Sequence, residues 1–384
     1  MTPPSPRTFL VFSGGNDRAI ISFLRALNGC GQRAAIVARA NKDLILKSKY
    51  RDWVVHIRKD HALSVEVFQN GLEAARNSTG EKSFVVLPST EYFNMFLLGN
   101  REEIENLGCM VPLVDRIIYA LLSEKRSSID FFKTAGFQVP NELDGGGSLR
   151  HPVVAKPKVN VSRDGRSLYP QLLITSQKLE DFLSTEDLSE YFFQEHVGGQ
   201  SIYLMFYLPR DGSNPITWSQ CNYLQQPNGK SILLAKSARF HQTNDAKKII
   251  MALSSLGFWG LGMVELMISE EGGVFIEMNP RPWGPMQLCV DACPQLLECF
   301  IGEWCFDQPS RFVTRGAAGG RSDSNYGWLN GLVETLVRGN RPVPHGYRKG
   351  ILTVLWECMN NDVYLRRDSW RCFFAEMSRV VQER

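Results

Sequence analysis

Short apolar runs alternate with amphipathic segments over the first 115 residues of the chain. The runs that predict strands lie at 8–13, 33–38, 49–56 and 82–87, and the segments with helical spacing lie at 19–27 and 66–76. Strands that alternate with helices at this spacing are typical of a parallel, doubly wound sheet. We therefore predict an α/β unit that ends near residue 115.

The pattern changes further along the chain. A helical stretch at 116–135 is followed, from residue 152, by short strands joined by tight turns. These strands are expected at 153–157, 172–175, 191–196, 201–208, 216–223 and 231–236. A helix at 245–256 and a hairpin made of 260–268 and 274–278 come next, and after about residue 310 the chain is helical and rich in tryptophan. The predicted order is α/β, then α+β, then a helical extension.

Composition and charge narrow the class of protein. The chain has 384 residues, and its 43 lysines and arginines against 40 aspartates and glutamates leave a net charge of +3. A balance this close to neutral is not typical of a dedicated nucleic-acid binder. The apolar runs are far shorter than the ~20 residues that cross a bilayer, and nine scattered cysteines without a CxxC pair are typical of a reducing compartment. We expect a cytoplasmic protein that binds neither nucleic acid nor membrane.

The densest chemical signal lies in the hairpin near residue 270. If the turn falls at 270–272, the numbers of paired residues sum to 542, and Glu265 lies directly opposite Glu277. The β-carbons of such a pair are ~4.5–5.5 Å apart, where like charges destabilise the sheet. Asn279 projects from the same face as Glu277. Two carboxylates and an amide oxygen are hard ligands that suit Mg²⁺.

Apolar residues on the other face of the hairpin predict that it is buried. These residues are Leu266, Ile268, Val274, Ile276 and Met278. A carboxylate pair on a buried hairpin needs a cation or shifted pKa values. The two glutamates alone leave a second interpretation open. In that interpretation both side chains face water and form ion pairs with lysines elsewhere in the chain. Asn279 and Arg281, which follow at fixed offsets, favour the metal.

The second strand of the hairpin ends in the segment EMNPR at 277–281, which resembles the Glu-x-Asn-x-Arg strand of the ATP-grasp superfamily. Upstream, Lys125 and Lys156 are similar in position to the two phosphate-side lysines of that superfamily. The segment 193–199 resembles the hinge whose backbone holds the adenine. By this resemblance the nucleotide contacts would be Gln194, Glu195, His196, Val197 and Gln200. The motifs cover about residues 115–305 in the expected order.

The resemblance implies an α/β fold built from several units. A Rossmann-like parallel sheet would occupy residues 1–115, before the two α+β subdomains of an ATP-grasp unit. The subdomains would span 116–190 and 191–310, with a helical C-terminal extension at 311–384. This plan is similar to stand-alone ATP-grasp ligases rather than to the multidomain carboxylases.

The resemblance also implies ligase chemistry. Members transfer the γ-phosphoryl group of ATP to a carboxylate, and an amine attacks the acyl phosphate to form an amide with release of ADP and phosphate. Mg²⁺, which Mn²⁺ could replace, would be held by Glu265, Glu277 and Asn279, and Arg281 would face the γ-phosphate and the oxyanion. The substrates would be a small carboxylic acid and an amine, with an amino acid or a small peptide as the default. A homodimer is common among such ligases.

Further residues are candidates for substrate or phosphate binding. Lys236, Arg239 and His241 lie between a strand and a helix, where they could bind a substrate carboxylate or the γ-phosphate. A solvated turn is the alternative for His241. Residues 13–16 and 89–91 follow strands of the first sheet, at the edge where such sheets bind ligands.

Two departures from the family pattern leave other functions open. The phosphate-covering loop at 158–167 has one glycine and two arginines, so it would either clamp phosphate through charge or be a solvated loop. Gln200 stands near where relatives often carry an acid for the ribose. Two alternatives to a ligase are therefore an ATP-grasp small-molecule kinase and a nucleotide-binding regulator without turnover.

Overall fold

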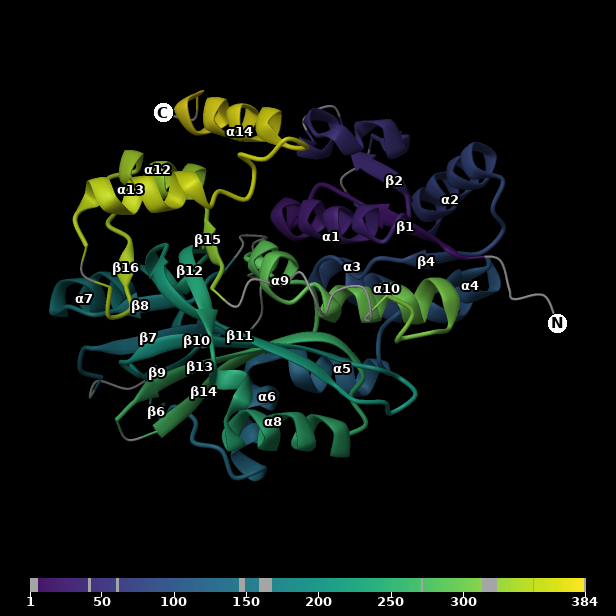
Figure 1. The fold of residues 1–384 in the computed structure, drawn as a ribbon. Helices are drawn as coiled ribbons and strands as arrows, with labels where there is room; N and C mark the ends of the chain where they lie inside the picture. Colours follow the sequence, from purple (N-terminus) through teal and green to yellow (C-terminus); the bar gives the residue numbers. More distant parts are fainter. Residues whose placement is uncertain are drawn as a thin grey trace.

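The computed structural model describes residues 6–40, 43–59, 62–144, 149–158, 168–270, 272–312, 323–347 and 349–382. Within these ranges the strands form three sheets. Figure 1 shows the first sheet at the upper right, the largest below it, the smallest at the lower left, and the C-terminal helices along the top. No helix in these ranges is long and apolar enough to cross a membrane.

The first sheet is parallel, in the order β3-β2-β1-β4-β5. Its strands are β1 (Thr8–Phe12), β2 (Ala34–Arg39), β3 (Val54–Arg58), β4 (Phe84–Val86) and β5 (Cys109–Met110). The helices of this unit are α1 (Asp17–Gly29), α2 (Val65–Thr79), α3 (Glu91–Gly99) and α4 (Arg101–Asn106), with the 3₁₀ turns η1 (Leu44–Lys47) and η2 (Lys49–Trp53). The doubly wound unit is confirmed. The strand expected from residue 49 begins only at Val54, because Ser48 accepts a hydrogen bond from Tyr50 N and caps η2.

The second sheet is small and antiparallel, in the order β6-β9-β7-β8. Its strands are β6 (Glu142–Leu143), β7 (Val153–Pro157), β8 (Gln171–Leu173) and β9 (Tyr191–Glu195), and α7 (Ser176–Thr185) and η3 (Leu188–Glu190) connect β8 to β9. Because β9 pairs with both β6 and β7, it belongs to this sheet. The subdomain boundary expected at residue 190 stays a prediction, and β9, which follows it, pairs within the smaller sheet.

The third sheet is the largest and is antiparallel, in the order β14-β13-β10-β11-β12-β15, with β16 paired to β11. Its strands are β10 (Gln200–Leu208), β11 (Ile216–Gln225), β12 (Ile232–Ala238), β13 (Gly260–Ser269), β14 (Gly272–Asn279), β15 (Asn325–Gly327) and β16 (Val343–Pro344). The 3₁₀ turns η4 (Pro227–Gly229) and η5 (Phe240–Gln242) flank β12. Helix α8 (Asn244–Ser255) packs on one face of this sheet, and α9 (Met286–Ala292) and α10 (Gln295–Phe306) pack on the other.

The helical stretch expected at 116–135 is two helices, α5 (Arg116–Ser123) and α6 (Lys125–Thr134). Glu124 between them has extended backbone angles, and the hydroxyl of Ser127 donates to a carbonyl oxygen of α5. A local bond of this kind competes with a continuous helix. Both helices lie against β14, where the rings of Phe132 and Phe275 stack with centroids 4.0 Å apart. They therefore support the carboxylate hairpin.

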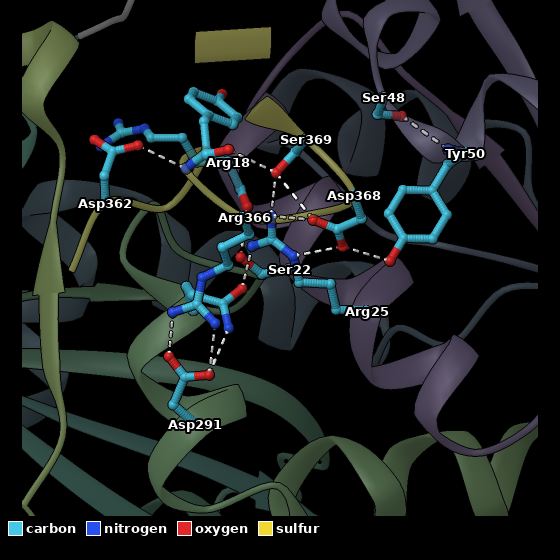
Figure 2. Close-up of polar contacts among 12 residues, drawn as sticks. Arg18, Ser22, Arg25, Ser48, Tyr50, Asp291, Asp362, Arg366, Asp368 and Ser369 are labelled. Carbon is cyan, nitrogen blue, oxygen red and sulfur yellow. Dashed lines mark hydrogen bonds and ion pairs between the residues drawn. The ribbon is translucent and has the colours of Figure 1, made fainter. Parts of the chain in front are cut away.

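The C-terminal extension is helical, as expected, but it also contributes strands to the largest sheet. In its described residues the helices are α12 (Leu329–Val337), α13 (Ile351–Asn360) and α14 (Trp370–Gln382). Strands β15 and β16 come from the same extension and pair with β12 and β11. Figure 2 shows how its end is fastened to the first unit: Arg25 donates to both oxygens of Asp368 at 2.8 and 2.9 Å, and Tyr50 donates to the same carboxylate at 2.9 Å.

Candidate active site

Strands β13 and β14 form the hairpin that the sequence predicts. Glu265 pairs directly with Glu277, and Asn279 lies two residues further along β14, as the predicted register requires. Because side chains alternate between the two faces of a strand, these three residues share one face. The predicted pairing of Glu265 with Glu277 is confirmed.

Beyond Glu265 the hairpin departs from the predicted register, because a β-bulge shifts the pairing by one residue. Leu266 pairs with Phe275 instead of Ile276, so Phe275, and not its two neighbours, enters the core. Ile276 was expected to face the core but instead lines a cavity. Its carbonyl oxygen accepts a hydrogen bond from Lys156 Nζ at 3.1 Å. The bulge therefore turns part of the strand toward the site.

The carboxylates and their neighbours form one connected cluster. Burial and the charge of Glu277 raise the pKa of Glu265, and a 2.8 Å hydrogen bond from Ser201 Oγ opposes that shift. Asn279 Nδ2 donates to Glu277 Oε1, and Arg281 donates to Asn279 Oδ1, both at 2.8 Å. Each polar side chain is thereby held in place by the next.

This set of donors fits a divalent cation. Two carboxylates that face each other on a largely buried hairpin need positive charge to offset their repulsion, and an amide oxygen adds a third hard ligand. Among the described residues, no group of three or more His, Cys, Asp and Glu side chains is arranged to hold a metal, so a third protein ligand would have to be of another type, such as the amide of Asn279. Glu265, Glu277 and Asn279 are the residues that could hold Mg²⁺.

Two lysines lie within electrostatic range of Glu277. Lys156 on β7 is buried, which lowers its pKa to about 8, while Glu277 and Glu265 act in the opposite direction. Lys125 begins α6, and burial lowers its pKa against the opposing effects of Glu277 and Glu91. The structure therefore brings both predicted lysines to the carboxylate pair from different elements.

A cavity of about 270 Å³ lies beside the cluster. Its lining includes Lys156, Glu265 and Glu277, together with four residues of the predicted hinge, Gln194, Glu195, His196 and Val197. The side-chain oxygen of Gln194 is buried and has no hydrogen-bond partner among the described residues, so it can accept a bond from a ligand. The carboxylate of Glu195 accepts two 3.0 Å bonds from Asn141. The backbone N–H of Glu195 also donates to the carbonyl oxygen of Asn141 at 3.0 Å, so Asn141 fixes this end of β9.

No family model and no curated protein matches the chain. Among solved structures, the ADP complex of PurK, an N5-carboxyaminoimidazole ribonucleotide synthetase, aligns over 94% of this chain and 98% of its own, at 13% identity and a TM-score of 0.62. Biotin carboxylase from Campylobacter jejuni aligns over 77% of this chain and 70% of its own, at 15% identity and a TM-score of 0.55. The biotin carboxylase domain of Hydrogenobacter thermophilus 2-oxoglutarate carboxylase aligns over 80% and 70%, at 13% identity and a TM-score of 0.55. These are ATP-grasp proteins. The chain has the ATP-grasp fold.

Within this ATP-grasp fold, Lys236 lies on the face of the large sheet opposite to the carboxylates. Lys236 pairs with Cys221, whereas the row of paired residues that contains Glu265 runs through Tyr203 to Ser237. Because neighbours along a strand point to opposite faces, Lys236 points away from Glu265. It forms a 2.8 Å ion pair with Asp323 instead. The structure therefore does not bring Lys236 to the carboxylate pair.

Other residues singled out by the ATP-grasp resemblance are not among those that line the cavity. Gln200 donates its amide to the backbone oxygen of Asn222 at 2.8 Å, so it joins two strands rather than reaching toward a ribose. Arg239 is exposed just after β12 and stays a prediction. His241 bonds to Ser219 at 2.9 Å. Of the phosphate-covering loop expected at 158–167, residues 159–167 lie outside the described part of the chain.

The C-terminal extension supplies a wall of the cavity that sequence reasoning missed. Residues Val343, Pro344 and His345, here called the strap, line the cavity, and the first two pair with the end of β11. His345 Nε2 lies 2.9 Å from Gln225 Oε1, and burial, followed by the charge of His196, lowers the pKa of His345. A two-residue strand that contains a proline has no periodicity to detect, so no sequence pattern could have found it.

The edge of the first sheet meets the same cluster. Asn16, just before α1, donates from Nδ2 to the backbone oxygens of Ser89 and Pro282, both at 3.0 Å. Pro282 follows Arg281 directly in the chain, so the segments 13–16 and 89–91 lie beside the end of the carboxylate strand. These segments stay candidates for substrate contacts.

Proposed function

We propose that the protein is an ATP-dependent carboxylate–amine ligase, which activates a carboxylate as an acyl phosphate and joins it to an amine with release of ADP and phosphate. The observation that carries the proposal is the opposition of Glu265 and Glu277 on the wall of a cavity that also contains Lys156 and the hinge residues. The fold supports it, because PurK was solved with ADP and the Hydrogenobacter domain with MgADP and bicarbonate.

ATP and Mg²⁺ would bind where the donor atoms fit them. The metal ligands would be Glu265, Glu277 and Asn279, the phosphate-side cations would be Lys125 and Lys156, and the adenine contacts would come from 194–197. When bound, the metal neutralises charge on the phosphates and orients the oxygens that exchange the phosphoryl group.

The side chains of the protein would supply the remaining chemistry. The ammonium group of Lys156 is fixed by its bond to the Ile276 carbonyl oxygen, so a phosphate oxygen in the cavity would gain a charge-assisted hydrogen bond. Arg281, anchored on Asn279, would stabilise negative charge on the transferred group and on the oxyanion. The strap would help to exclude water, which would otherwise hydrolyse the acyl phosphate. The acid and the amine would be small molecules, with amino acids and small peptides as the first to test.

The replacement Glu277→Gln tests this function. We expect ADP release with an acid and an amine to fall by at least ~100-fold, because a bound metal supplies several kcal/mol of charge stabilisation. ADP release would be measured over pairs of amino acids, with the products identified by mass spectrometry. Glu298→Gln is the control, because Glu298 is also partly buried but lies in α10, away from the cavity. Unchanged turnover in Glu277→Gln would contradict the metal assignment.

The same assay separates the ligase from the two alternatives. A stable phosphorylated product that forms without any amine would identify a small-molecule kinase. Tight ATP binding without ADP release over a broad panel of acids and amines would identify a nucleotide-binding regulator.

A further inference from the structure

Three polar side chains lie fully buried in the large sheet next to the carboxylate pair. Ser201 is on β10, and Gln220 and Asn222 are on β11. Burial of hydroxyl and amide groups costs free energy unless they form hydrogen bonds. A polar side chain buried inside a sheet therefore needs hydrogen-bond partners, and these three residues provide such partners for one another.

The three side chains form a chain of hydrogen bonds that ends on Glu265. Gln220 Nε2 donates to Asn222 Oδ1 at 2.7 Å, and Asn222 Nδ2 donates to Ser201 Oγ at 2.8 Å. Ser201 Oγ then donates to Glu265 Oε1 at 2.8 Å. An ionised carboxylate can only accept, and a hydroxyl has one proton. When Glu265 is ionised, as metal binding requires, its carboxylate therefore fixes the direction of the whole chain of hydrogen bonds.

We propose that Ser201, oriented by Asn222 and Gln220, is a positioning residue that fixes the rotamer of Glu265 for metal binding. Ser201 occupies Oε1 of the carboxylate, which leaves Oε2 available to a cation. Carboxylates that bind metals are commonly held in place by hydrogen bonds from neighbouring groups, and loss of such a bond lowers the affinity for the metal. The inference rests on the proposed function, because that function assigns Glu265 to the metal.

Gln200 supports the same arrangement through a hydrogen bond to the backbone of Asn222. Its amide donates to the carbonyl oxygen of Asn222 at 2.8 Å, which ties β10 to β11 at the residue that orients Ser201. A polar residue predicted to contact the ribose thus helps to hold the carboxylate network. Gln220 Oε1 has no partner among the described residues, so the chain of bonds begins at Gln220.

The chain offers a closely matched control for Ser201. Ser219 lies on the adjacent strand, is equally buried, and uses its hydroxyl in contacts with His241. Its paired residue is Leu204, on the face of the sheet opposite to Glu265. Ser219→Ala therefore removes a buried hydroxyl of the same kind without touching the carboxylate network.

The test measures binding of Mn²⁺ in the presence of ADP, by titration calorimetry and by the electron paramagnetic resonance spectrum of the bound ion. We expect Ser201→Ala to lower the affinity for Mn²⁺ by about 10- to 100-fold, the usual effect of losing a hydrogen bond to a metal ligand. Asn222→Leu, one bond further away, should give a smaller loss and the same change in the spectrum. Ser219→Ala should leave both readouts unchanged.

A second pair of variants distinguishes loss of the hydroxyl from a change in packing or folding. Ser201→Thr keeps the hydroxyl, and Ser201→Val has nearly the same shape without it, so both carry the same packing change. We expect Thr to bind Mn²⁺ within about threefold of the unmodified protein and Val to show the full loss. Equal Mn²⁺ affinity for Thr and Val would overturn the inference. If the unmodified protein binds no Mn²⁺ with ADP, the proposed function fails instead.

Discussion

The charged side chains at the cavity depend on one another for their charge. Burial alone raises the pKa of Glu265 and lowers the pKa of Lys156, so either group by itself would tend toward its neutral form. Each offsets that tendency in the other, and Glu277 acts on both. Lys156 and the paired carboxylates are therefore one electrostatic unit, although they come from different sheets.

The sequence predicts the positions of the two carboxylates because a single structural rule relates them. Glu265 and Glu277 lie in one hairpin, so a single pairing rule placed them opposite each other. Lys236 lies three strands away from Glu277's partner, and its face depends on every register in between, including a β-bulge next to Asn222. Such irregularities leave no mark in the hydrophobic pattern, so the face of Lys236 could not be predicted.

Asp17, at the start of α1, predicts how stability depends on pH. Burial and then the charges of Asp43 and Glu376 raise its pKa from 3.8 to about 7, against the opposing effects of Arg379 and Arg39. Because the folded state holds the proton more tightly than the unfolded state, folding stability is lost as the pH rises from about 4 to about 7. We expect Asp17→Asn to be more stable than the unmodified protein at pH 8 by about 2 kcal/mol, about half of the full linkage energy, since some solvent reaches the side chain.

Urea unfolding at pH 5 and at pH 8 measures this effect. At pH 5 the folded protein already carries a neutral Asp17, so the two proteins should differ much less there than at pH 8. A stability difference that is the same at both pH values would show that Asp17 does not titrate as described.

At the scale of elements, regular patterns were predicted well and interruptions were not. The alternating strands and helices of the first sheet and the carboxylate hairpin follow directly from periodicity. The break at Glu124 and the bulge beyond Glu265 depend on local hydrogen bonds and packing that a hydrophobic pattern does not record. The strap is the extreme case, because it is too short to have a period at all.

The strap carries a prediction for nucleotide binding. We expect His345→Ala to lower the affinity for ADP by about threefold to tenfold. The replacement removes part of the cavity wall and a hydrogen bond to Gln225 worth about 1 kcal/mol. Fluorescence or calorimetric titration with ADP would measure the loss. His241→Ala is the control, because His241 bonds to Ser219 and is not among the cavity-lining residues. Equal affinities in the two variants would mean that the strap does not contact the nucleotide.

At the scale of the whole molecule, the C-terminal extension connects the first sheet to the cavity. Near its end, Arg25 and Asp368 join α1 to the segment before α14, and Arg366 forms a second ion pair with Asp291 of α9 at 2.5 Å (Figure 2). At its other end the extension adds β15 and the strap to the large sheet. A contact far from the cavity lined by the strap can therefore influence a wall of that cavity through this one segment.

The replacement Arg25→Leu tests that connection. The Arg25 and Asp368 side chains are only 10% and 17% exposed, so losing the arginine leaves a carboxylate largely buried and should cost about 3 kcal/mol of folding stability. Because the loosened extension carries the strap, ADP affinity should fall as well, by about as much as in His345→Ala. Arg338→Leu breaks an ion pair of the same extension in which the arginine is 56% exposed, and should change stability by less than about 1 kcal/mol with no change in ADP affinity. If Arg25→Leu lowers stability but binds ADP as tightly as the unmodified protein, the large sheet holds the strap without help from α1.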